Sequence, residues 1–426
     1  MTLPPSTGPW QSGAAVRAVQ RRTLVLLSLA QVAGGIGFGA GLSVGILLAT
    51  DVTRSEGWAG VARTSTTVVA AAVALPLARA AVRSGRRISL TTGWAVAALG
   101  SALLVAVAGM TPSAPATLLL VVGLGLTGAG SAASLQSRYA AVDLAPDDRR
   151  SRQLSLVVWS TTVGTVLGPN LGVPGEALSR ALGLAPIAGA FVIATVMQLV
   201  AALITSALRP DPLVLAGRYV APRAPGAGER PSAVAALRRA WGQRPSRLAL
   251  IALCAAHTVM VAVMTMTPVH MDHHGASLAL VGLTISLHVV GMFAFSPWVG
   301  AAADRFGRIP VLATGAGVLL LALLVAGTSG DSMARVTVGL VLIGVGWSCA
   351  LVAGSALLTE SVPEADRLAV QGGSDAAMNV AAAIGAAASG PLLGLIGFAG
   401  LSGFGAVLLG LALLLTLTGP DRRVAA

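Results

Sequence analysis

Apolar residues form long runs along the chain, and most polar residues stand between them. An apolar helix of about 20 residues crosses about 30 Å of hydrocarbon, and runs of that length recur throughout the sequence. The pattern therefore predicts an all-α membrane protein with twelve transmembrane helices. The expected spans are 22–49, 58–82, 88–109, 116–140, 152–172, 186–208, 248–271, 277–303, 310–329, 333–359, 368–396 and 398–418.

The longest polar segment lies between the sixth and seventh expected spans and is rich in Arg, Pro and Gly. It divides the chain into two six-helix bundles joined by a cytoplasmic linker. The expected parts are an N-terminal tail at 1–21, a bundle at 22–208, the linker at 209–247, a second bundle at 248–418 and a tail at 419–426. Residues 233–241 of the linker are expected to be either solvated or a short helix at the membrane surface.

Composition and charge agree with a membrane location. The chain has 55% hydrophobic and 10% charged residues and a mean hydropathy of +0.82, which excludes a soluble globular protein of this length. All 28 basic residues are Arg, and the predicted spans leave only four of them at outer ends: Arg54, Arg63, Arg180 and Arg335. This asymmetry places both termini in the cytoplasm, so the net charge of +12 indicates orientation rather than a nucleic-acid partner.

The first expected span is too long to be a cleaved signal peptide. We therefore expect it to be retained in a multi-pass protein of a bacterial cytoplasmic (inner) membrane. Cys254 and Cys349 both fall inside expected spans, so a disulfide framework is not expected.

The two halves repeat short motifs at equivalent places. The loop after span four reads Asp-Leu-Ala-Pro-Asp-Asp-Arg-Arg at 143–150, and the loop after span ten reads Ser-Val-Pro-Glu-Ala-Asp-Arg at 361–367. Spans five and eleven carry helix-packing motifs at Gly164, Gly168, Pro169 and Gly172, and at Gly385, Gly390, Pro391 and Gly394. Two parallel six-helix repeats are typical of a transporter that exposes a central site to each side in turn.

The loop between spans eight and nine holds a compact charged motif, made of Gly300, Asp304, Arg305, Gly307 and Arg308. Gly300 at the start of the motif permits a close helix crossing, and Gly307 near its end permits a turn. Asp304 can meet a helix N-terminus or an Arg of the other half. The alternative is that the Arg residues only anchor the topology. In the equivalent loop between spans two and three, Gly85 and Arg86 are present, but Val82 replaces the acid and Ala78 the first glycine.

With these motifs the chain resembles the major facilitator superfamily over nearly its full length. The resemblance implies the two-bundle fold of that family, secondary active transport, and a cytoplasmic latch at the Asp304 loop. The Gly-Pro motif of span five is similar to that of drug–proton antiporters. Their span four carries an Arg before its glycine cluster, and this chain lacks one before 123–133.

All five histidines lie between residues 257 and 288. Helical periodicity gives spans seven and eight one sulfur- or imidazole-bearing face each. If these faces meet, they form a row of soft ligands, here called the sulfur–imidazole row: Cys254, His257, Met260, Met264, His288 and Met292. Thioether, thiolate and imidazole together favour Cu(I). The alternatives are packing for each methionine and a proton relay for His257 or His288.

The outer connection of spans seven and eight is expected to be either a collecting loop for metal or a solvated loop; its candidates are His270, Asp272, His273 and His274. The pair Met260-x3-Met264 with His288-x3-Met292 resembles the CcoA-like copper importers of the superfamily, a branch that also contains riboflavin transporters. That resemblance implies copper import, with copper as the transported substrate and no resident cofactor.

Asp375 shares one stripe of span eleven with Gln371 and Asn379 and is the candidate proton-coupling carboxylate. The alternative is a residue at the helix start, near the cytoplasmic surface. Arg138 in span four is expected to extend its side chain to the inner face.

Three functions are consistent with the sequence. The first is copper import through the sulfur–imidazole row, and the second is proton-coupled transport of an organic solute, by drug efflux or uptake of a vitamin such as riboflavin. A membrane sensor is the third, although no signalling domain is attached. The sequence shows no nucleotide-binding loop or catalytic triad, so we do not expect an enzyme. The expected partners are the lipid bilayer and a small solute or metal ion, with the protein acting as a monomer.

Overall fold

The computed structural model describes residues 10–53, 57–219 and 232–418, and this part of the chain folds into helices without a strand. The expected tail at 419–426 and Arg54 lie outside the described residues, as does the side chain of Arg63. The first half and the linker contain α1 (Ala14–Thr53), α2 (Gly57–Ala108), α3 (Ala114–Ala140), α4 (Arg150–Leu167), α5 (Gly172–Leu182), α6 (Ala188–Ser206), α7 (Pro212–Ala216) and α8 (Ala233–Trp241). The second half contains α9 (Arg244–His273), α10 (Leu278–Phe293), α11 (Ser296–Phe306), α12 (Arg308–Gly327), α13 (Met333–Ser361) and α14 (Glu364–Thr418).

Nine helices of the described residues are long and apolar enough to cross a membrane. Two of them, Thr64–Ala108 and Glu364–Leu414, have 45 and 51 residues. At about 1.5 Å per residue each measures roughly 70 Å, about twice the hydrocarbon thickness. Both turn at a glycine with a left-handed backbone, Gly85 (φ +86°) in α2 and Gly397 (φ +69°) in α14. The breaks fall where the sequence separates span two from three and span eleven from twelve.

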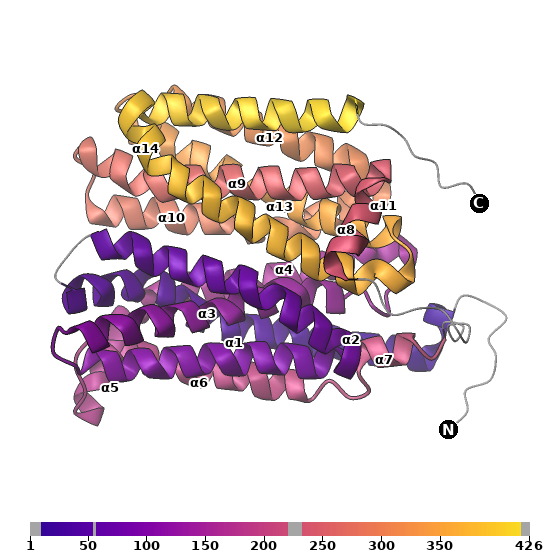
Figure 1. The fold of residues 1–426 in the computed structure, drawn as a ribbon, viewed down its shortest axis with the longest axis horizontal. Coiled ribbons are helices and arrows are strands. Elements are labelled where there is room, and N and C mark those ends of the chain that lie inside the picture. Colours follow the sequence, from indigo (N-terminus) through magenta and orange to yellow (C-terminus); the bar gives the residue numbers. More distant parts are fainter. Residues whose placement is uncertain (1–9, 54–56, 220–231, 419–426) are drawn as a thin grey trace.

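The helices form two groups that meet along α2, α4, α11 and α14. In Figure 1, α1, α3 and α6 lie in the lower part, and α9, α12 and α13 in the upper part. The described part of α1 begins, and that of α14 ends, at the end of the bundle drawn on the right. Because the sequence gathers most of its Arg residues there, this end is here called the arginine-rich end.

At the arginine-rich end the two groups share one apolar core. Val142, Leu154 and Val158 of the first half pack in the same buried cluster as Leu253 and Leu358 of the second. The first half also has apolar clusters of its own, around Leu27 and Trp94 and around Leu48 and Phe191. The halves are therefore joined by buried surface as well as by the polar contacts described below.

Helix α8 forms in the linker and packs its Ala236 and Ala240 into the second half, while Val234 and Trp241 are exposed. Its Arg239 binds Asp366 at the start of α14 at 2.9 Å. This hydrogen-bonded contact raises the pKa of Arg239. Residues 233–241 therefore form a helix packed against the second half rather than a solvated linker segment.

The glycines of span five pack as the sequence predicts. A Cβ at Gly164 would collide with the Val32 carbonyl of α1 and lie 2.8 Å from the Cα of Gly35. A Cβ at Gly168 would lie 2.5 Å from the Cα of Gly39, also in α1. These contacts let the backbones of α1 and α4 approach closely, which stabilises helix pairs in lipid. The side chain of Pro169 and the surroundings of Gly172 lie outside what the structure describes.

The matching prediction for span eleven is only partly met. A Cβ at Gly385 would lie 2.7 Å from the Thr258 side chain of α9. Around Gly390 and Gly394, by contrast, a Cβ would meet nothing within 4 Å. The predicted packing role of these two glycines is wrong for this conformation, because that part of α14, including the exposed Pro391, lies away from its neighbours.

We expect Gly164→Ala to destabilise the protein by about 1–3 kcal/mol, because the added methyl group overpacks a contact made by backbone atoms. The measurement is the thermal unfolding midpoint of the detergent-solubilised protein. The control is Gly317→Ala, on the exposed face of α12, where a Cβ meets nothing within 4 Å. Because Ala has a higher helix propensity than Gly, that variant should be as stable as the parent or up to about 1 kcal/mol more stable. Equal destabilisation of both variants would contradict the packing described here.

Candidate functional site

A buried ion pair joins the two halves at the last turn of α3, toward the arginine-rich end. The Nη2 atom of Arg138, in α3, lies 2.5 Å from the Oδ1 atom of Asp375, in α14, and each side chain is 1% exposed. Arg138 therefore does not extend to the inner surface, and that prediction is wrong. Asp375 lies about three turns inside α14 rather than at its first turn. The alternative reading of Asp375 as a helix-start residue is also wrong.

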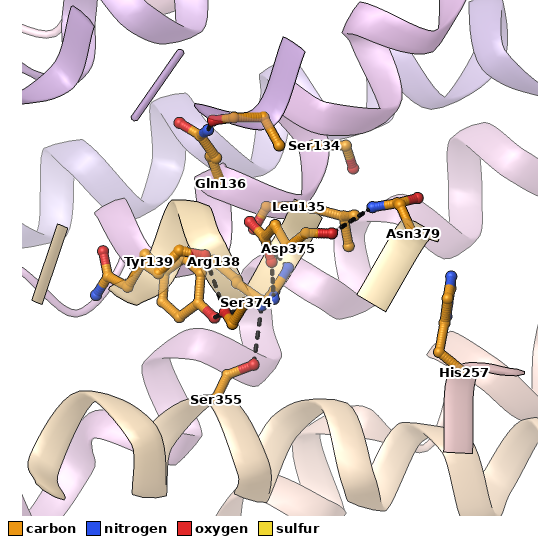
Figure 2. Close-up of polar contacts among 12 residues, drawn as sticks. Ser134, Leu135, Gln136, Arg138, Tyr139, His257, Ser355, Ser374, Asp375 and Asn379 are labelled. Carbon is orange, nitrogen blue, oxygen red and sulfur yellow. Dashed lines mark hydrogen bonds and ion pairs between the residues drawn. The ribbon is translucent and has the colours of Figure 1, made fainter. Parts of the chain in front are cut away.

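The remaining donors of Arg138 are satisfied by groups from both halves, as Figure 2 shows. Its Nε donates to the hydroxyl of Ser355 in α13 at 2.9 Å, and its Nη1 to the carbonyl of Leu135 at 2.8 Å. Its Nη2 also donates to the Tyr139 hydroxyl at 3.1 Å, and that hydroxyl lies 3.2 Å from the hydroxyl of Ser374. Several hydrogen bonds therefore hold the guanidinium in one orientation.

The Asp375 carboxylate is less completely satisfied. Its Oδ1 binds Arg138, whereas its Oδ2 is buried and has no hydrogen-bond partner among the described residues. Its backbone carbonyl accepts a hydrogen bond from the Asn379 side chain at 2.8 Å. A buried charge is tolerated only while it is paired. The pair therefore holds the halves together here, and Oδ2 is the place where a proton can be added.

The partners of Arg138 were not predicted from the sequence. Ser355 stands at the same distance before Pro363 as Arg138 does before Pro146. The repeat between the two halves could therefore have indicated that Arg138 and Ser355 lie close together. A second signal was available in span four. Ser131, Ser134 and Arg138 recur at helical spacing on one face, which marks a polar stripe directed into a bundle.

The Asp304 loop binds the N-terminus of α4. The Asp304 carboxylate accepts hydrogen bonds from the backbone N–H groups of Ser151 and Arg152 at 3.1 and 2.8 Å. These are first-turn N–H groups that lack a partner within the helix, and the helix dipole favours a carboxylate there. The contact crosses from one half to the other at the arginine-rich end.

The other residues of the motif support this contact. Arg308 binds Asp304 at 3.1 Å and Glu360 of α13 at 2.8 Å. Gly307 turns the chain with φ +97°, and a Cβ at Gly300 would collide with the Ser155 hydroxyl of α4. Arg305 is exposed.

The histidines of the sulfur–imidazole row have partners on α13. The indole Nε1 of Trp347 donates to the Nδ1 atom of His257 at 2.8 Å, and Phe293 packs edge-on against the same indole. The buried His288 has its Nδ1 atom 2.6 Å from the carbonyl of Leu340. Each ring is thus held by a hydrogen bond to α13.

The sulfur atoms of the row lie within apolar packing. Met260 is 3% exposed in the core of the second half, and Met264, Met292 and Cys254 pack partly buried against that core. Helix α10 packs mainly against α13 and has few contacts with α9. Among the described residues, no three His, Cys, Asp or Glu side chains are arranged to hold a metal ion. Copper binding by the row stays a prediction.

The outer histidines form a compact group at the end of α9. His270 is 8% exposed and stacks on Phe398 at a ring distance of 4.2 Å. The Nδ1 atom of His274 lies 2.7 Å from the carbonyl of His270, and its Nε2 atom lies 3.5 Å from Asp331. His273 is exposed, and the side chain of Asp272 lies outside the described residues. The structure therefore groups His270 with His274, and the collecting role stays a prediction.

Comparison with known proteins identifies relatives across the whole chain. A family model described as Major Facilitator Superfamily matches residues 24–286 and 248–425. The uncharacterized MFS-type transporter YddS of Bacillus subtilis (strain 168) is 36% identical over 391 residues, which are 91% of this chain and 88% of that protein. The riboflavin transporter RfnT of Brucella anthropi is 29% identical over 267 residues, which are 61% and 62% of the two chains.

Solved structures share the fold. The crystal structure of the human organic anion transporter MFSD10 superposes with a TM-score of 0.70 at 16% sequence identity. The alignment covers 93% of this chain and 99% of that one. At this level of identity the likeness concerns the fold alone.

Removing one partner of the buried pair should destabilise the protein strongly. We expect Asp375→Ala to lower the unfolding free energy by about 3–5 kcal/mol, because it leaves the Arg138 charge buried and unpaired. The double variant Arg138→Met/Asp375→Leu should regain most of that loss. The measurement is thermal unfolding in detergent.

The matched control for this comparison is Asp148→Ala. Its partner is Arg149, and the two side chains are 72% and 67% exposed, so water already screens their charges. Its unfolding midpoint should stay close to that of the parent. A double variant as unstable as Asp375→Ala would show that the lost stability comes from packing and not from the unpaired charge.

Proposed function

Since the chain belongs to the major facilitator superfamily of membrane transporters, we propose that it moves a small organic solute by alternating access coupled to protons. Members of this family are transporters, so the protein is a transporter and not an enzyme. The observation that carries the proposal is the buried Arg138–Asp375 pair, which joins the two halves and leaves one carboxylate oxygen without a partner.

The pair gives protonation a mechanical effect. A proton added at Oδ2 removes the negative charge that faces Arg138, and the attraction between the halves falls. Arg138 keeps the Tyr139 hydroxyl and the Leu135 carbonyl of its own half as partners when the halves separate, whereas Ser355 belongs to the other half. The protonated protein then opens at the arginine-rich end. When the proton leaves, the ion pair forms again and closes that end.

We propose that the chain crosses the membrane twelve times, with both termini in the cytoplasm. The kinks at Gly85 and Gly397 divide two long helices into two crossings each. The broken helix pair α4 and α5 supplies the fifth crossing, joined by a short 3-10 turn (Gly168–Leu171). The positive-inside rule makes the arginine-rich end cytoplasmic, and the bacterial relatives support a location in the cytoplasmic membrane.

An organic solute is favoured over copper by two observations. One relative is named a riboflavin transporter. In the present chain, the ring of His257 packs against Trp347 and Phe293 packs edge-on against the same indole, which gives the second half an aromatic group near the middle of α9 and α13. Trp347 is 3% exposed in this conformation, so this group would stack on a planar ring system only after the halves separate.

Asp375→Asn separates proton coupling from solute movement. In proteoliposomes, an acidic exterior should drive riboflavin accumulation by the parent. The Asn variant should accumulate at least about tenfold less riboflavin than the parent, because an amide cannot release a proton. Exchange of internal for external riboflavin should continue, since the neutral side chain still allows the halves to separate. The control is Asp51→Asn, whose exposed side chain lies near the far end of α1.

Copper uptake is the competing outcome of the same experiment. If the parent accumulates radioactive Cu(I) but no riboflavin, and Met264→Leu or His288→Ala abolishes that accumulation, the organic-solute proposal is wrong. If Asp375→Asn accumulates riboflavin as the parent does, the coupling role of the carboxylate is wrong.

A further inference from the structure

The loop between spans two and three has lost two residues of the charged motif, yet its geometry matches that of the Asp304 loop. Both loops turn at a glycine with positive φ, Gly85 at +86° and Gly307 at +97°. An Arg follows each glycine. Val82 stands where the other loop has Asp304, and Ala78 where it has Gly300.

The two Arg residues make the same ion pair within their own halves. The guanidinium of Arg86 binds both carboxylate oxygens of Asp143, at 2.8 and 3.1 Å. Arg308 binds Glu360 at 2.8 Å. Asp143 and Glu360 stand at the same distance before the prolines that the two loops share, Pro146 and Pro363. The Arg86 side chain is 2% exposed and that of Arg308 12%, so the pair in the first half is the more deeply buried.

The contact between the halves is also present, although its chemistry is different. In the second half, the Asp304 carboxylate accepts hydrogen bonds from the N-terminus of α4. In the first half Val82 replaces that acid, and Arg86 itself donates to the side-chain oxygen of Gln371, in α14, at 2.8 Å. The cation thus makes the link across the halves that Val82 cannot make.

The two crossings differ in which helix supplies the glycine. A Cβ at Gly300 would collide with the Ser155 hydroxyl, so the small residue is on the motif side of that crossing. At the other crossing a Cβ at Gly372 would collide with the Cβ of Ala78, so the small residue is on α14. Ser155 and Gly372 stand at the same distance after the shared prolines and occupy equivalent positions. Each crossing therefore has one residue without a side chain, supplied by a different partner.

We propose that the first half carries a second cytoplasmic latch, in which Arg86 joins Asp143 to Gln371 and Gly372 provides the room that Ala78 takes up. The proposal rests on the proposed alternating access, because a latch has meaning only if the halves separate. Both latches close the arginine-rich end, one along α2 and α14 and the other along α4 and α11. The end opens only when both release.

The test measures the separation of the halves directly and needs no solute. Spin labels are placed at Ser84→Cys and Ala365→Cys, two exposed sites on opposite sides of the α2–α14 crossing, in a background with Cys254→Ala and Cys349→Ala. Electron–electron double resonance then reports the distance between the labels in the detergent-solubilised protein. The parent should show mainly one short distance.

Gly372→Ala should raise the ratio of long to short distances about tenfold, because the two methyl groups cannot occupy the same space. Adding Ala78→Gly should restore the short distance, since the double variant only exchanges the two residues. Gly394→Ala is the control on the same helix, where a Cβ meets nothing within 4 Å and no change is expected. Gln371→Ala removes the acceptor of Arg86 without adding volume and should also favour the long distance.

An unchanged distance in both Gly372→Ala and Gln371→Ala would overturn the second latch, as would a failure of Ala78→Gly to restore the short distance. If Gly372→Ala does not fold, the Gln371→Ala result decides. These outcomes are independent of the solute. A parent that carries no organic solute would refute the proposed function and leave the latch in place, whereas an unchanged distance would refute the latch alone.

Discussion

The arrangement of the halves depends on one electrostatic requirement, namely that two opposite charges out of contact with water must stay paired. Arg138 and Asp375 come from different bundles, so the only way to keep both charges satisfied is to keep the bundles together. The close packing of the apolar core shared at the arginine-rich end also joins the halves, but this packing does not change with pH. The charge of the Asp375 carboxylate does change with pH, because it is lost when a proton binds. The site that stabilises the closed state is thus also the site that can release it.

The rest of the interface follows from helix packing in a bilayer. Lipid is as apolar as the side chains, so helices gain little by burying apolar surface and associate instead through close contact and hydrogen bonds. The glycine contacts of α4 with α1 and the backbone contact of Asp304 with α4 are both of this kind. Each needs a backbone that another group can reach, which explains why small residues and turn glycines recur at the crossings.

The sequence predicted the helical course of the chain well, because hydrophobic length and turn glycines are local properties. The breaks at Gly85 and Gly397 and the approach of Asp304 to a helix N-terminus follow from such local signals. Arg138 was placed at the wrong depth, since an Arg in a membrane helix can either extend to the surface or find an acid, and the acid is more than two hundred residues away. The face of α10 that meets α13 was equally hidden, because periodicity gives the direction of a side chain on its helix but not the neighbour it meets.

The exchange of glycine between Ala78 and Gly372 has a consequence for how such proteins are compared. A crossing of two helices fixes the combined volume of the residues at the contact, not the identity of either one. A pattern read along a single helix therefore reports Ala78 as a lost motif residue, although the pair as a whole still fits. If the combined side-chain volume of the two facing positions were compared, this loop would fall in the same class as its counterpart around Gly300.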